Sequence, residues 1–205
     1  MRQQISRLPL VTLLLAGCTV FIHFICDLQL YLQYARPAIL SGDLWRLITA
    51  HLCHWSFDHL FWDFLVFVVL GSVCELRWPG SYLKTLFLSA VLISSALLFF
   101  EKEMITYRGL SGIDSALFCL VCGKLFIHSV RTANRTGIIL TAALFALLLA
   151  KSGYEATASH TLFVTATETF VVVPLAHLVG GAVGLLFGVA SRPVVTPAIF
   201  LLGRP

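Results

Sequence analysis

A serine and a histidine stand inside apolar segments of this chain, where polar side chains are costly and call for a partner or a function. Ser111 lies in Gly109-Leu110-Ser111-Gly112 at the start of one segment, and His177 lies in a later segment. A serine hydroxyl that hydrogen-bonds an imidazole is a nucleophile with its general base. The sequence therefore predicts serine-type nucleophilic catalysis, provided that the fold brings the two side chains together.

The composition places these residues in a membrane. Of the 205 residues, 59% are hydrophobic and 12% are charged, and the mean hydropathy is +0.92. Soluble domains carry about 25% charged residues. No linker or low-complexity tract divides the chain, so we expect one domain over residues 1–205. The basic residues behind the net charge of +4 are scattered, which excludes a nucleic-acid partner and leaves the lipid bilayer as the expected environment.

Six apolar segments approach the length of about 20 residues that a transmembrane helix needs. They predict an all-α polytopic bundle of six transmembrane helices, over residues 8–26, 57–74, 82–100, 110–128, 137–150 and 170–190. A further run, Val194 to Leu202, is too short to span and is expected at the surface. Leu15-Ala16-Gly17-Cys18 is similar to a lipoprotein cleavage site, but the apolar run continues beyond it, which favours an uncleaved helix.

The basic residues also predict the orientation. With six crossings, nine of the 14 Lys and Arg residues lie on the side of the N-terminus and five on the opposite side. Lys and Arg concentrate in the cytoplasmic loops of membrane proteins. We therefore expect both termini in the cytoplasm (N-in/C-in) and Ser111 towards the outer face.

Depth arithmetic indicates that the serine and the histidine meet. Counted from the cytoplasmic ends of their segments at about 1.5 Å per residue, Ser111 rises about 20 Å and His177 about 22 Å. Asp63 rises about 21 Å by the same count, and His59 lies one turn above it on the same helix face. In a hydrocarbon core about 30 Å thick, the four residues form one polar layer below the outer surface.

Glycines explain how the two helices approach each other. Gly180, Gly184 and Gly188 recur every four residues beside His177, and small residues at this spacing let helices pack closely. We expect this strip to pack on the helix that Ser111 opens. The residues just before Ser111 then descend into the membrane as non-helical backbone, where Gly109 permits a tight turn. The free N–H groups at the start of that helix favour an oxyanion at Ser111.

At this point the sequence resembles the rhomboid family of intramembrane serine proteases over nearly its whole length. The matching elements are Trp45-Arg46, His54-Trp55-Ser56-Phe57-Asp58-His59 with Asp63, Gly109-Leu110-Ser111-Gly112, and His177-Leu178-Val179-Gly180 with Gly184. The short chain and Asp63 resemble the rhombosortase branch, which is associated with bacterial proteins that carry a C-terminal Gly-Gly, hydrophobic helix and basic tail.

The resemblance implies a mechanism without a cofactor. Ser111 is the implied nucleophile, His177 the implied base, and His59 and Gly109 belong to the oxyanion and substrate region. Asp63 departs from the usual asparagine donor at its position, and a protonated Asp63 would restore a donor. The implied substrate is the transmembrane helix of a protein in a bacterial cytoplasmic membrane, cut near the outer face. No third, acidic member of the catalytic pair is implied.

Two alternatives remain open in the sequence. The cluster His51, His54 and His59 has spacing that suits zinc, which would make the chain a membrane metalloenzyme, although no His-Glu-x-x-His motif is present. A non-proteolytic rhomboid-like protein that binds membrane clients is the other alternative. The six cysteines show no disulfide framework, and His51 and His54 are otherwise expected to hydrogen-bond loop backbone.

Overall fold

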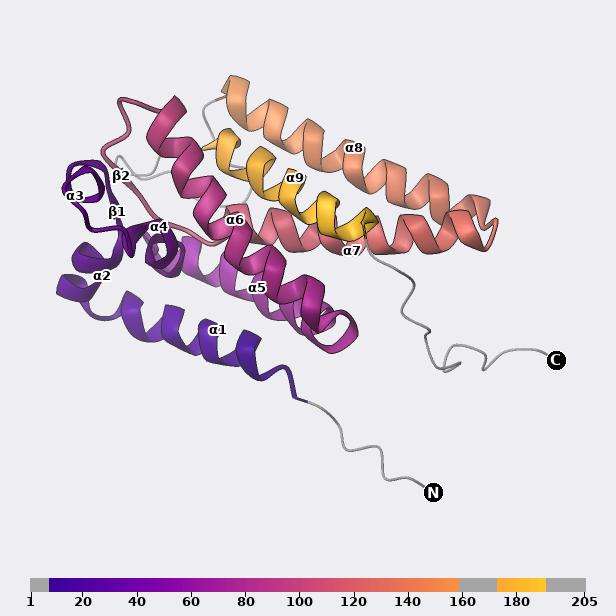
Figure 1. Ribbon diagram of the computed structural model, residues 1–205, viewed down its shortest axis with the longest axis horizontal. Helices are drawn as coiled ribbons and strands as arrows, with labels where there is room; N and C mark the ends of the chain where they lie inside the picture. The colour runs from indigo at the N-terminus through magenta and orange to yellow at the C-terminus, as the bar shows by residue number, and fades with distance from the viewer. Residues whose placement is uncertain (1–7, 159–172, 191–205) are drawn as a thin grey trace.

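The computed structural model describes residues 8–158 and 173–190, which form a bundle of helices with a cap of short elements at one end (Figure 1). Four of the described helices are long and apolar enough to cross a membrane. They are α5 (Phe57–Arg77), α6 (Pro79–Phe100), α7 (Ser111–Arg131) and α8 (Arg135–Ala158). The protein is therefore a multi-pass membrane protein, and the segments expected at 57–74, 82–100 and 110–128 correspond to three of these helices.

The first expected crossing, residues 8–26, corresponds to α1 (Leu10–His23) and ends in a bend. The next helix, α2 (Cys26–Leu32), continues at an angle of 117° to α1. The side chain of Gln29 folds back and donates a hydrogen bond to the carbonyl of His23, which satisfies an acceptor at the end of α1. The residues at the bend, Phe24 and Ile25, are apolar, so hydropathy alone extends the predicted helix to residue 26, whereas α1 ends at His23. Counted as one span, α1 and α2 raise the described total to five.

The sixth expected crossing contains α9 (Pro174–Val189), a 16-residue apolar helix that is shorter than a full span. Most of the residues that would extend it, and the expected surface run Val194–Leu202, lie outside the described residues. Six crossings and the N-in/C-in orientation thus stay predictions. All six cysteines are unpaired, as the lack of a disulfide framework predicted.

The cap lies between α1 and α5 and contains short elements. These are α2, β1 (Tyr34–Ala35), α3 (Arg36–Leu40), α4 (Arg46–Thr49) and the 3-10 helix η1 (Ala50–Leu52). The buried guanidinium of Arg46 holds them together, because it donates to the carbonyls of Leu30 and Gln33 and to the carboxylate of Asp43. β1 pairs antiparallel with β2 (Thr106–Tyr107), which ties the cap to the segment that enters α7.

The tightest packing in the bundle joins α7 and α9. A Cβ added to Gly180 would overlap the carbonyl oxygen of Gly112, and one added to Gly184 would overlap that of Ala116. At Gly188 an added Cβ would lie 3.0 Å from the Cα of Gly123. The two backbones are thus in direct contact, as the glycine spacing predicted. In Figure 1, α9 lies alongside α7 and α8.

Candidate active site

Ser111 is the first residue of α7 and follows a stretch of non-helical backbone. Gly109 in this stretch has a φ of +133°, which side-chain-bearing residues rarely adopt. A Cβ at Gly109 would also lie 2.9 Å from the ring of His59, so glycine is needed for two separate reasons. The turn holds the hydroxyl of Ser111 below the cap, inside the bundle.

The imidazole of His177 lies opposite Ser111. Pro174 opens α9, and His177 follows in its first turn with 7% of its surface exposed. Its Nε2 is 3.2 Å from the Oγ of Ser111, within hydrogen-bonding distance. A neutral ring protonated on Nδ1 presents the lone pair of Nε2 to the hydroxyl, which is the tautomer that accepts its proton. The structure therefore brings together the two residues that the depth arithmetic paired.

The backbone around Ser111 offers donors for negative charge. The first four N–H groups of a helix have no partner within that helix, and Ser111 begins α7. Leu110 is already used, since its N–H donates to Oδ2 of Asp63 over 2.9 Å. The N–H of Ser111 itself is the donor closest in sequence to the reacting hydroxyl. This arrangement suits an oxyanion that forms on a carbonyl attacked by Ser111.

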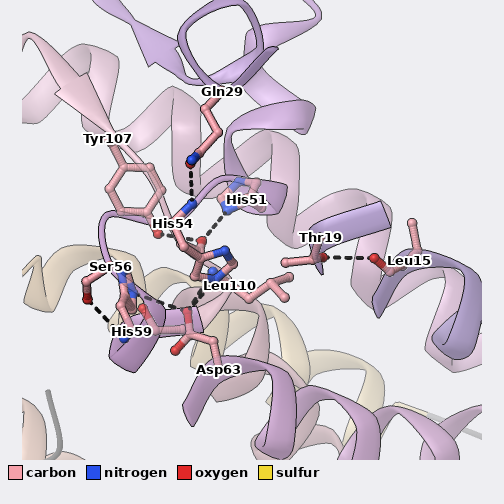
Figure 2. A network of polar contacts seen from close by, with 12 residues as sticks. Leu15, Thr19, Gln29, His51, His54, Ser56, His59, Asp63, Tyr107 and Leu110 are labelled. Carbon is pink, nitrogen blue, oxygen red and sulfur yellow. Dashed lines mark hydrogen bonds and ion pairs between the residues drawn. The ribbon is translucent and has the colours of Figure 1, made fainter. Parts of the chain in front are cut away.

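His59 and Asp63 form a second polar group beside the turn (Figure 2). The hydroxyl of Ser56 caps α5 by accepting the N–H of His59, which fixes where this helix starts. One turn later, Oδ2 of Asp63 lies 3.2 Å from Nε2 of His59 and 3.1 Å from Nε2 of His54. Because the N–H of Leu110 donates to the same oxygen, Asp63 also connects α5 to the loop that carries Gly109 and Leu110.

The contacts of Asp63 show one of its carboxyl oxygens as an acceptor. Its Oδ2 faces the N–H of Leu110, which can only donate, and two ring nitrogens. A carboxylate with three nitrogen neighbours is stabilised as an acceptor. Oδ2 of Asp63 therefore binds the turn before Ser111 and orients two imidazoles, whereas a protonated Asp63 that donates stays a prediction.

His51 and His54 differ in what they contact. Nδ1 of His51 faces the carbonyl of Gly109, as expected for a structural histidine. Nε2 faces the carbonyl of Ala90 and the hydroxyl of Ser94, and this hydroxyl can donate to Nε2 when the ring is neutral. Burial lowers the pKa of His51, which keeps the ring neutral. His54 was expected to bond loop backbone in the same way, but its ring contacts the carboxylate of Asp63 instead. Within residues 8–158 and 173–190, the group that can hold a metal is thus His54, His59 and Asp63, without His51.

A comparison with known families gives the identity. The family model described as Rhomboid domain matches residues 41–193, which include all of the residues above. The chain belongs to the rhomboid family. This is a family of intramembrane proteases, so the membrane setting inferred from composition agrees with it. A search of curated proteins gives no match to this sequence.

The structure of this rhomboid protein also adds a residue that the sequence reasoning missed. The helix that the sequence predicts over residues 137–150 stops before Glu155, but α8 continues to Ala158. Glu155 is only 3% exposed, and its Oε2 lies 3.4 Å from Nδ1 of His177. Lys151 pairs with the same carboxylate over 2.8 Å. The Lys151/Glu155 spacing of four residues was the available signal, because it places both side chains on one helix face.

Two other polar residues lie on α7 near Ser111. The hydroxyl of Ser115 donates to the carbonyl of Ser111, one turn back, and is thereby satisfied. Asp114 is buried, and its Oδ1 has no hydrogen-bond partner among the described residues. These contacts give Asp114 no place in the Ser111 and His177 pair.

Proposed function

We propose that this protein is an intramembrane serine endopeptidase in which Ser111 is the nucleophile and His177 the general base. The observation that carries the proposal is the 3.2 Å contact between Nε2 of His177 and Oγ of Ser111, at the first residue of a helix. Membership of the rhomboid family supports the reaction class. The non-helical turn before Ser111 supports access for an extended substrate strand.

The reaction proceeds in two halves. His177 takes the proton of Ser111 on Nε2 while Oγ attacks the scissile carbonyl. The N–H of Ser111 and the side chain of His59 hold the oxyanion, and the leaving amine receives the proton from His177. Water then hydrolyses the acyl-enzyme with His177 again as base. Asp63 does not react, but fixes His59 and the N–H of Leu110.

The substrate we propose is the transmembrane segment of a membrane-anchored protein, cut near the outer face of a bacterial cytoplasmic membrane. The charge asymmetry of the loops supports this side, and the cap lies at the end of the bundle where α7 begins (Figure 1). A helix must unwind to expose a carbonyl, and glycines ease this unwinding. Short C-terminal sorting tails of the Gly-Gly type meet both requirements, which favours the rhombosortase branch.

The test is cleavage of a tagged substrate with such a tail in cells that co-express the protease. Wild type is expected to release the tag, whereas Ser111→Ala and His177→Ala are not. Equal processing by wild type and Ser111→Ala contradicts the proposal. An arm with EDTA on purified protein separates the metalloenzyme alternative, since loss of cleavage on chelation would favour a metal on His54, His59 and Asp63.

A further inference from the structure

We propose that Glu155 is a positioning residue for His177, so that the Ser111 and His177 pair works with a third, acidic member supplied by α8. The inference rests on the proposed serine protease function and deepens it. Its starting point is the 3.4 Å separation between Oε2 of Glu155 and Nδ1 of His177. Seen from the imidazole, Ser111 lies at one ring nitrogen and a carboxylate at the other.

The ring nitrogen that faces Glu155 has no other acceptor. Nδ1 of His177 is buried and makes no hydrogen bond to any described residue. A buried N–H without a partner is costly, and a tautomer with the proton on Nε2 would present an N–H instead of a lone pair to the Oγ of Ser111. The carboxylate of Glu155 resolves both problems, because it attracts the proton to Nδ1. At 3.4 Å the contact is longer than a formed hydrogen bond, and such contacts shorten in the reacting complex.

The direction in which Glu155 points is unusual for its helix. Only 11% of the apolar stretch of α8 is buried, and most of the large side chains of this helix are exposed. Among the residues of α8 whose burial the structure describes, the buried ones are polar, namely Thr141, Ser152 and Glu155. A carboxylate that merely solubilised α8 would lie on the exposed face. Glu155 instead turns inward, towards the start of α9.

Pairing with Lys151 alone does not explain this placement. Lys151 Nζ lies 2.8 Å from both carboxylate oxygens of Glu155, and 29% of its side chain is exposed. The lysine precedes the glutamate in this pair, and an ion pair in that order stabilises a helix less than one in which glutamate comes first. An ion pair between helix neighbours also forms readily at the surface. The role of Lys151 that fits the burial is to balance the charge of Glu155 while the carboxylate faces His177.

The proton transfers define what Glu155 does. The proton of Ser111 moves from Oγ to Nε2 of His177, which gives an imidazolium with both nitrogens protonated. Glu155 stabilises this cation through the N–H on Nδ1 and keeps its own charge throughout. The Nε2 proton then passes to the leaving amine nitrogen. No proton reaches Glu155, so it acts through His177 rather than on the substrate.

The experiment measures the rate of labelling by a fluorophosphonate in purified full-length protein. We compare wild type with Glu155→Gln, Lys151→Gln and the double variant, and use the exposed Glu103→Gln as the matched control. Glu155→Gln is expected to lower the maximal labelling rate at least tenfold with a change in probe affinity below twofold. Lys151→Gln is expected to label at least as fast as wild type, since Glu155 then serves His177 alone.

Two further readouts separate positioning from a purely structural role. The midpoint of the labelling rate against pH is expected to move to lower pH in Glu155→Gln, because the imidazole loses a negative neighbour, and to higher pH in Lys151→Gln. The double variant removes the Lys151 pair without leaving a buried charge unpaired, and is expected to be as slow as Glu155→Gln.

Opposite results overturn the inference. Equal losses in Glu155→Gln and Lys151→Gln would show that only their ion pair matters. A wild-type rate in Glu155→Gln or in the double variant would show that His177 needs no acidic partner. Failure of wild type itself to label would count against the proposed function instead, so the two failures are distinguishable.

Discussion

Two regions of the bundle differ in how they are packed, namely the contact between α7 and α9, called the seam below, and the outer helix α8. At the seam, glycine removes the side chains and the backbones touch, so the separation of Ser111 from His177 is fixed by main-chain contact. On α8, most apolar side chains face outward and the inward contacts near the site are polar. The comparison teaches that the nucleophile and base are placed by rigid packing, whereas the group behind the base belongs to the least buried long helix.

The largest contrast is expected from leucine truncations on the two helices. Leu120 on α7 is fully buried and Leu147 on α8 is 68% exposed. Leu120→Ala is expected to lower the free energy of unfolding by about 2–5 kcal/mol because it leaves a cavity, and Leu147→Ala by less than about 0.5 kcal/mol. Reversible unfolding in detergent measures both. Similar losses would show that α8 is packed as firmly as α7.

The next contrast uses the same substitution at two glycines. Gly184→Ala forces a Cβ into the carbonyl of Ala116, whereas Gly153 on α8 has open space around it. Gly184→Ala is expected to cost about 1–3 kcal/mol and to lower labelling at least tenfold, because α9 must move away from Ser111. Gly153→Ala is expected to be neutral or slightly stabilising. Normal labelling of Gly184→Ala would mean that the seam does not set the geometry of the pair.

A smaller loss is expected from Asp63 on the other side of the turn. Asp63→Leu leaves the N–H of Leu110 and the rings of His54 and His59 without their acceptor. We expect the free energy of unfolding to fall by about 1–3 kcal/mol and fluorophosphonate labelling to become about tenfold slower. Asp63→Asn keeps one acceptor oxygen and is expected to retain more of both. If Asp63 were a protonated donor, Asn would replace it without loss.

The smallest effect concerns His51, which lies between the turn and α6. Burial lowers its pKa in the folded protein, so unfolding at acid pH takes up a proton that the folded state excludes. Stability is therefore expected to fall as the pH drops below about 6.5, the value for an unfolded histidine. His51→Gln should flatten this part of a curve of melting temperature against pH. An unchanged curve would exclude His51 as a source of the acid sensitivity.

The sequence predicted the seam better than the surroundings of the pair. The four-residue spacing of glycines and the depth of a residue in the membrane can both be read from a single helix. The contact of Ser111 with His177 could therefore be predicted from the positions of Gly180 and Gly184. The bend after His23 could not, because a hydrogen bond from Gln29 sets it and hydropathy does not change there. The acceptor role of Asp63 depends on Leu110, 47 residues away, which no spacing rule connects.

The approach of Glu155 to His177 was missed for a related reason. Charged residues near the end of an apolar run usually mark a loop, and the helix predicted over residues 137–150 accordingly ends before Lys151 and Glu155. Their mutual neutralisation lets α8 continue by two turns and turn a carboxylate inward. The packing of α8 against α9 is needed to show that the carboxylate of Glu155 contacts His177.

The central claim is tested most directly by locating the residue that a fluorophosphonate modifies. Labelled protein is digested and the adduct is mapped by mass spectrometry, in wild type and in His177→Ala. We predict a single adduct on the Oγ of Ser111 that disappears when His177 is removed. An adduct on another serine, or one on Ser111 that forms equally fast without His177, would contradict the account.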